Sequence, residues 1–286
     1  MNLSLAGIIP VAGQKLDFDM PWHDALMPIA PDYLMVERAV VECAYAGCKT
    51  IWIVCNDDMQ PLIRHKIGEV IQDPVYVNRS FARHASEHKK PIRIYYVPIN
   101  AKDANKRDCL SWSVIHGAET ARKICGSLST WLTPRKFYVA WPYGYYNPSV
   151  IRKKRDVLKK SNVYLSSEYG GVSDGQYMGF SFDVDTLKQL KEEVKVKSTG
   201  FWKDVGSKEK LPISERFSYR FFSLQDVFDT LDLSEHELIK VDDYYRIDNW
   251  ADYCAFLAAN NDIKRPHDAI FSYKEWNEIG YDTPEQ

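Results

Sequence analysis

The residues of this chain that could carry chemistry begin in a short loop behind its first apolar run. Ala12, Gly13, Gln14 and Lys15 follow that run, LAGIIPV at 5–11. Because glycine has no Cβ, Gly13 suits either a tight turn or a close approach of backbone N–H groups to a phosphate. Lys15 is the nearest cation and a candidate phosphate contact, with a solvated lysine as the alternative. The sequence therefore predicts a phosphate-binding loop here, or a plain turn.

Three further groups of side chains have types and spacings that could serve a site. His84 and His88 are four residues apart and could share one helical face, but no third metal ligand lies near them in the sequence. The basic run 152–155 is either a solvated helix face or a contact for phosphate or an acidic partner. Four aromatic residues at the end of an apolar run could stack on a base or form a packing plug. They are Trp141, Tyr143, Tyr145 and Tyr146.

The elements that must position these residues alternate between strand-like and helix-like segments. Short β-branched or aromatic runs bounded by turn residues predict strands at 5–11, 50–55, 92–99, 136–141 and 162–166. Apolar residues spaced by three and four predict helices at 31–47, at 110–127 and after Asn147-Pro148. This order is typical of a parallel sheet with both faces covered. We therefore expect an α/β fold with a mostly parallel central sheet flanked by helices on both faces.

The later part of the chain continues this pattern in a more polar sequence. Its predicted strands are 175–184 and 238–241, its predicted helices are 185–194, 215–231 and 249–260, and 195–211 is a predicted loop. No internal repeat and no flexible linker divides the chain. We therefore expect one domain over residues 1–263, followed by a polar C-terminal tail over 264–286.

Composition excludes several classes of function. The chain has 37 basic and 39 acidic residues, so no excess of positive charge favours nucleic acid as a partner. No apolar run reaches the ~18 residues that span a bilayer, and the N-terminus lacks the features of a signal peptide. Six cysteines without a CxxC pair indicate reduced thiols, and the motifs GxSxG, P-loop, HExxH and GxGxxG are absent. We expect a soluble, cytoplasmic protein without a membrane or nucleic-acid partner.

Six segments of the chain carry a family resemblance through their order and spacing. They are GIIPVAG (7–13), LMPI (26–29), VERAVVECAYAGCKTIWIVCNDD (36–58), LSWSVIHGAETA (110–121), FYVAWPYGYY (137–146) and YYRIDNWADYCAFLAANN (244–261). Together they resemble the nucleotidyltransferases that make activated sugars, including cytidylyltransferase-like members. The resemblance covers residues 5–261, nearly the whole chain. It implies a nucleotide-diphospho-sugar transferase-like fold of the glycosyltransferase-A type, with ligands at the carboxyl ends of the strands.

The resemblance also implies which residues form the site. Lys15 and Asp248 would be catalytic, and Asp248 would also bind Mg²⁺. The nucleotide-binding residues would be Ala12, Gly13, Gln14, Ser113 and Tyr143. The implied reaction transfers a nucleotidyl group from a nucleoside triphosphate to a sugar phosphate, which attacks the α-phosphorus while pyrophosphate leaves. Catalysis in such a site is mostly positioning and electrostatic stabilisation.

The chain departs from the family pattern at the charged positions of the site. Its loop lacks the second glycine and the arginine, and Asp24 stands where the family has a lysine. An anion at that position is unfavourable beside a triphosphate. The central strand ends in Trp141-Pro142-Tyr143, where the family has an aspartate. Two functions stay open: magnesium-dependent nucleotidyl transfer, or an inactive homologue that serves as a binding or structural subunit for a protein partner.

Overall fold

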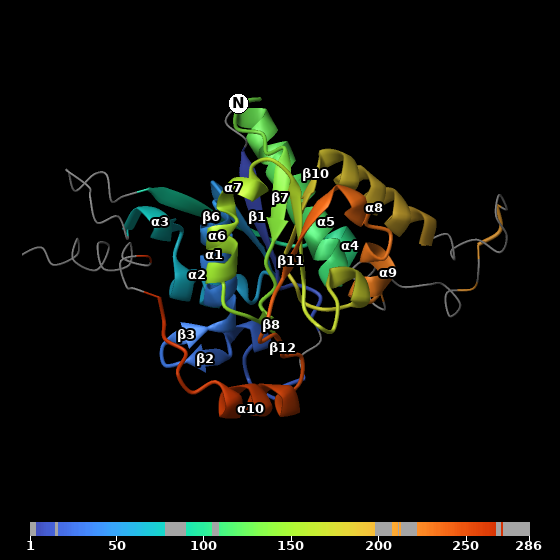
Figure 1. Cartoon of the computed structure of the whole chain (residues 1–286). Helices are drawn as coiled ribbons and strands as arrows, with labels where there is room; N and C mark the ends of the chain where they lie inside the picture. The colour runs from blue at the N-terminus through green and yellow to red at the C-terminus, as the bar shows by residue number, and fades with distance from the viewer. Residues whose placement is uncertain are drawn as a thin grey trace, which may run out of the picture.

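The computed structural model describes residues 4–14, 17–77, 90–104, 109–197, 208–210, 212, 222–266 and 270. Within these residues a sheet of eight strands forms the centre, in the order β11-β9-β10-β7-β1-β4-β6-β5 (Figure 1). Its strands are β1 (Leu5–Pro10), β4 (Thr50–Val54), β5 (Val70–Gln72), β6 (Pro91–Val97), β7 (Lys136–Val139), β9 (Asn162–Ser166), β10 (Phe180–Asp183) and β11 (His236–Lys240). β1 is parallel to β4 and β7, β4 to β6, and β9 to β11, whereas β5 and β10 are antiparallel to their neighbours. The predicted, mostly parallel sheet is confirmed.

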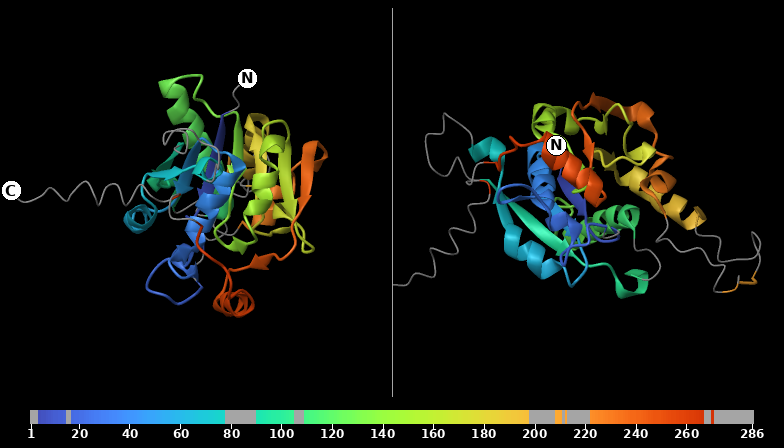
Figure 2. Two further views of the ribbon diagram at one scale, coloured as in Figure 1. Left: turned by 60° about the vertical axis from the view of Figure 1, so that its left-hand side comes forward. Right: turned by 90° about the horizontal axis from the view of Figure 1, so that it is seen from below.

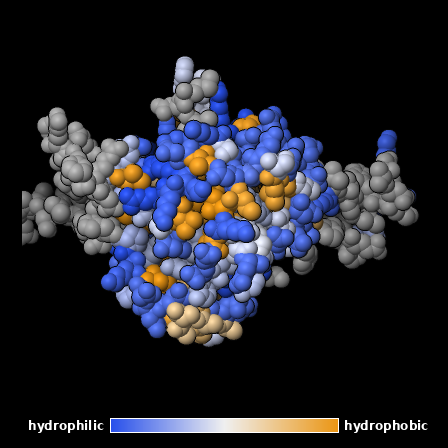
Figure 3. All heavy atoms as spheres, viewed as in Figure 1, coloured by the Kyte–Doolittle hydropathy of each residue, from blue (hydrophilic) through white to orange (hydrophobic). Residues whose placement is uncertain are grey.

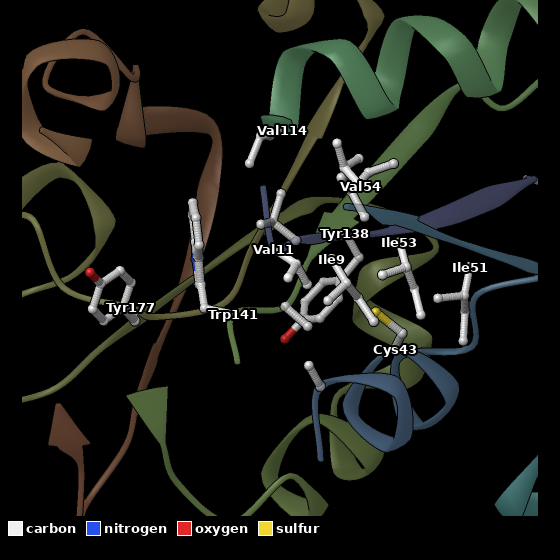
Figure 4. Packing of buried hydrophobic residues seen from close by; sticks show 14 of the residues in the cluster. Ile9, Val11, Cys43, Ile51, Ile53, Val54, Val114, Tyr138, Trp141 and Tyr177 are labelled. Carbon is white, nitrogen blue, oxygen red and sulfur yellow. The ribbon is translucent and has the colours of Figure 1, made fainter. Parts of the chain in front are cut away.

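Helices cover both faces of this sheet, as predicted. They are α1 (Met35–Ala46), α2 (Gln60–Ile67), α3 (Pro74–Val77), α4 (Ala101–Ala104), α5 (Leu110–Leu128), α6 (Ser149–Lys153), α7 (Arg155–Leu158), α8 (Val184–Lys197), α9 (Leu224–Phe228) and α10 (Trp250–Ala259). α6 and α7 pack beside α1, and α8 and α9 pack beside α5. Figure 4 shows Cys43 of α1 and Val114 of α5 on opposite sides of β1 and β4. β1 is buried along its whole length, which explains its unbroken apolar sequence.

Two predicted elements are shorter in the structure than in the sequence-based prediction, and a third lies partly outside the described residues. The helix predicted from residue 31 begins at Met35, because a hairpin of β2 (Pro28–Ala30) and β3 (Tyr33–Leu34) precedes it. The strand predicted at 175–184 is reduced to β10, since the chain before β10 forms turn-like hydrogen bonds, such as Gln176 N–H to Gly171 O at 3.0 Å. The helix predicted at 215–231 lies partly outside the described residues, which include α9.

Several small elements gather beyond the carboxyl ends of the parallel strands. They are the β2–β3 hairpin, helix α10, and the pair of β8 (Gly144–Tyr145) with β12 (Tyr245–Arg246). Figure 1 shows them below the sheet, the left view of Figure 2 keeps them at that end, and the right view, seen from below, shows α10 in front of the sheet. Ligands of open α/β sheets bind at this edge, so these elements frame the candidate site.

The outer surface agrees with this layered arrangement. Most of the face seen in Figure 3 is hydrophilic, with apolar side chains in small groups near its middle. Most of the large apolar side chains of the described residues belong to one buried cluster, whereas a few, such as Trp131 and Leu128, are exposed. In the part of the chain that the structure describes, no helix is both long and apolar enough to cross a membrane.

Candidate functional site

The loop predicted to bind phosphate lies at the carboxyl end of β1, against the start of α5. The N–H groups of Val11 and Ala12 both donate to the carbonyl of Val54 at the end of β4, at 2.8 and 2.9 Å. Gly13 follows with a φ of 88°, in the region that favours glycine. A Cβ at this position would lie 2.5 Å from the backbone of Cys109, the residue before α5. The loop therefore turns against the N-terminal end of a 19-residue helix, an end whose dipole favours anions.

Ser113 and Tyr143, both predicted to bind nucleotide, hold the carbonyl groups of this loop. Ser113 Oγ donates to Ala12 O at 2.7 Å, and Tyr143 OH donates to Val11 O at 3.3 Å. Both side chains are buried, and burial raises the pKa of the Tyr143 phenol well above its ordinary value. Trp141 of the same aromatic cluster is buried as well. In this arrangement the two hydroxyls fix the shape of the loop from within the protein.

Tyr177 joins the loop to the C-terminal part of the site. Gln14 lies near enough to the Tyr177 phenol to lower its pKa slightly, and the Tyr177 ring packs edge-on against Tyr143 with centroids 5.6 Å apart. The Arg246 guanidinium carbon lies 5.4 Å from the centroid of the same ring. Burial, reinforced by the Asp248 carboxylate, raises the pKa of Tyr177 to about 12, so the phenol is neutral at neutral pH. Tyr177 was not a predicted site residue, because an isolated tyrosine in a predicted strand gives no signal of such contacts.

Asp248, the predicted catalytic and metal-binding residue, is engaged with its own neighbours. Its Oδ2 accepts from Nε and Nη2 of Arg246 at 2.7 and 2.6 Å. Asp252 lies nearby, and burial together with the Asp248 carboxylate raises the pKa of Asp252. Asn249 caps α10 through its Oδ1, which accepts from Asp252 N at 2.9 Å. Asp248 thus lies in the short connection between β12 and α10, where Arg246 supplies the positive charge next to its carboxylate.

A magnesium ion bound to Asp248 would meet the Arg246 guanidinium on the same carboxylate. Mg²⁺ prefers oxygen ligands, and the chain has Trp141 and Pro142 at the position where the resemblance implies a carboxylate. Among the described residues, no group of three or more His, Cys, Asp or Glu side chains is placed to hold a metal. The residues present fit an ion pair better than a metal, and Mg²⁺ stays a prediction. The predicted histidine pair at 84 and 88 lies outside the described residues.

Asp24, at the position where the resemblance implies a lysine, is buried. It accepts the N–H of Asp17 at 3.1 Å and also that of Phe18, which closes the segment between β1 and the helical turn at Asp24–Leu26. Burial raises the pKa of the Asp24 carboxyl, and these hydrogen bonds only partly offset that rise. The Asp24 carboxylate also makes a small contribution to the raised pKa of Tyr143. Lys15, the other predicted catalytic residue, lies outside the described residues.

We expect His23→Asn to flatten the acid dependence of folding stability. His23 Nδ1 caps the turn at Asp24–Leu26 by accepting the N–H of Ala25 at 3.1 Å, and burial lowers the pKa of His23 to about 4. Because the unfolded histidine binds its proton near pH 6.5, the stability present above that pH is lost as the pH falls towards 4. The loss amounts to roughly 3 kcal/mol. Asparagine keeps a cap but cannot take up the proton.

Urea unfolding at pH 7 and pH 4.5 measures this effect. Carboxyl groups also take up protons over this pH range and affect both proteins. The quantity to compare is therefore the decrease in unfolding free energy between pH 7 and pH 4.5 in the wild type minus that in His23→Asn. Equal losses in the two proteins would show that His23 is not buried in its neutral form.

The fold is similar to solved structures of nucleotide-sugar enzymes. A glucose-1-phosphate thymidylyltransferase from Bacillus anthracis, crystallised with sucrose, superposes with a TM-score of 0.58 at 9% identity over 93% of this chain and 99% of its own. A UDP-glucose pyrophosphorylase complexed with UDP-glucose superposes with a TM-score of 0.50 at 12% identity over 91% of this chain and 98% of its own. No protein-family model and no curated protein matches the sequence. The fold of this chain is therefore that of the nucleotidyltransferases, as the sequence resemblance predicted.

Proposed function

We propose that this protein binds a nucleotide sugar, or a nucleoside phosphate, at the carboxyl edge of β1 and β7. The observation that carries the proposal is the position of Arg246 beside the glycine loop. One tyrosine, Tyr177, packs against Tyr143, which donates to the Val11 carbonyl at the start of that loop, and Tyr177 also lies under the Arg246 guanidinium. A guanidinium is suited to phosphate oxygens, and here it stands in a site whose loop lacks the family's arginine.

The proposed phosphate position has three supports. The loop at Gly13 meets the N-terminal end of α5, whose dipole favours an anion. Asp248 engages Nε and Nη2 of Arg246, and the Arg246 side chain is half-exposed, so a ligand can approach Nη1 while the ion pair stays intact. Asp24 is buried and hydrogen-bonded, so its charge is directed away from solvent. Binding therefore has a source of positive charge even though the family's lysine is absent.

Nucleotidyl transfer is the second candidate, and the observation that favours it is the same cation. Arg246 could offset charge on a triphosphate while a sugar phosphate attacks the α-phosphorus and pyrophosphate leaves. Against transfer stand Trp141 and Pro142 in place of a carboxylate, and the engagement of Asp248 by Arg246. We therefore place binding without transfer first, as the function of a homologue that retains the ligand site.

Thermal unfolding with a panel of ligands tests the proposal. The panel contains UDP-glucose, the common nucleoside triphosphates and glucose 1-phosphate, each with and without Mg²⁺. A ligand at a hundred times its dissociation constant should stabilise the fold by about 2.7 kcal/mol. Arg246→Ala should abolish that shift. Arg93→Ala is the matched control, because Arg93 is an exposed arginine of β6 for which the described residues show no ion pair.

The outcomes separate the two candidates. A ligand-specific shift that Arg246→Ala removes and Arg93→Ala keeps supports binding, and a pyrophosphate-release assay then decides whether transfer follows. A flat panel at millimolar ligand contradicts both and directs attention to a protein partner.

A further inference from the structure

A buried carboxylate on α1 lies beneath the candidate site without reaching it. The Glu42 side chain is fully buried and has three donors: Arg38 Nη1 at 2.8 Å, Tyr138 OH at 2.6 Å, and Tyr146 OH. Two of these donors belong to the segment that leads from β7 to β8, one before its turn and one after it. A single carboxylate thus ties α1 to both ends of residues 138–146.

Arg38 attaches α1 to the middle of residues 138–146 as well. Its Nη2 donates to the Trp141 carbonyl, and its guanidinium carbon lies 5.2 Å from the centroid of the Tyr146 ring. Tyr146 OH in turn accepts the N–H of Gly179 at 3.1 Å. A Cβ at Gly179 would lie 2.7 Å from Glu42 Oε1, so residue 179 has no room for a side chain beside this carboxylate. The turn at 141–146 is therefore fixed by directed hydrogen bonds, in addition to packing.

The turn at 141–146 carries the strand that places Arg246. Gly144 of β8 pairs with Arg246 of β12, and the Tyr143 carbonyl accepts the N–H of Ile247 at 2.8 Å. Any displacement of this turn therefore moves the backbone on which the guanidinium stands. The route from Glu42 and Arg38 to Arg246 passes through hydrogen bonds to Trp141 and Tyr146, the backbone of the turn, and the hydrogen bond between Tyr143 and Ile247.

We propose that Arg38 and Glu42 are positioning residues that determine where Arg246 lies, by holding the turn at 141–146. They touch no ligand themselves. Apolar side chains of similar volume could fill the same space, but they would not bond the Trp141 carbonyl or the Tyr146 hydroxyl. The inference rests on the proposed function, because it names the residues that orient the proposed phosphate-binding cation, Arg246. Its first test nevertheless needs no ligand.

Amide hydrogen exchange at Ile247, compared with exchange at the core amides of β4, is the deciding measurement. We expect Glu42→Gln and Tyr146→Phe to speed exchange at Ile247 relative to β4 by about tenfold or more, the effect of one lost hydrogen bond to a charged group. Tyr146→Phe leaves the ion pair intact, so the test survives if Glu42→Gln fails to fold. In a second measurement, both variants should weaken UDP-glucose binding by about the same factor.

The chain offers a matched control in a second buried ion pair. Asp73 is buried and bonds Arg155 Nη1 at 3.0 Å, near the end of α1. Figure 1 shows α7, which carries Arg155, towards the opposite end of the sheet from β8. Asp73→Asn should lower overall stability without changing the relative exchange at Ile247. If Ile247 exchange stays unchanged in folded Glu42→Gln and Tyr146→Phe, or changes equally in Asp73→Asn, the network is merely structural and the inference is overturned. Faster exchange without UDP-glucose binding would uphold the positioning role while counting against the proposed function.

Discussion

Gly13→Ala is expected to lower the free energy of unfolding by about 3 kcal/mol, from backbone strain and overpacking together. Gly13 has a φ of 88°, which an L side chain rarely adopts. The new Cβ would also lie 2.5 Å from the Cys109 backbone, which cannot move aside as a flexible side chain could. Relief requires α5 to shift from the loop, and that shift would also disturb the Ser113 bond to Ala12. Urea unfolding followed by circular dichroism measures the change.

Gly175→Ala is the matched control for this prediction. Gly175 also has a positive φ, 81°, but a Cβ there would meet nothing within 4 Å. Gly175→Ala should therefore lower the free energy of unfolding only through backbone strain, by about 1 kcal/mol. The difference between the two variants isolates the contact of the loop with α5. If Gly13→Ala costs no more than Gly175→Ala, the loop does not press against the start of the helix, and the proposed phosphate position loses its geometric basis.

Local sequence pattern was sufficient to predict the central layers of the fold. β1, β4, β7 and β9 lie within predicted runs, and α5 agrees with its predicted helix to within one residue. Each of these elements has an apolar pattern that fits one periodicity, so its type follows from its own residues. The loop at Gly13 was predictable for the same reason, since a glycine directly behind a buried strand indicates a turn at the carboxyl edge of the sheet.

Contacts between distant segments were beyond such reasoning. Arg246 lies over Tyr177 because β12 pairs with β8, and two-residue strands have no periodicity to recognise. Gly144 is the one sequence signal that could have indicated a close contact there, since its missing side chain admits the Tyr177 carbonyl. Asp24 was interpreted as a charge facing a triphosphate, but residue type does not reveal that its carboxylate turns inward to accept backbone N–H groups.

Arg38→Met is expected to destabilise the protein by about 3–5 kcal/mol, the cost of leaving a buried charge without its partner. Both members of the pair are almost fully buried, so water cannot solvate the Glu42 carboxylate that remains. Adding Glu42→Leu removes that charge, and we therefore expect the double variant to be more stable than Arg38→Met alone. Urea unfolding of the wild type, both single variants and the double variant gives the coupling energy.

The recovery in the double variant should be incomplete, for a reason that bears on the site. Tyr138 and Tyr146 would lose the acceptor for their hydroxyls, and the Trp141 carbonyl would lose its donor. Buried polar groups left in this way cost about 1–3 kcal/mol each. If the two single losses simply add in the double variant, Arg38 and Glu42 do not act as one pair. The other outcome is a favourable coupling energy together with a double variant that is still less stable than the wild type. It would mean that the pair contributes mainly by orienting the hydrogen-bonding groups of the turn that carries β8.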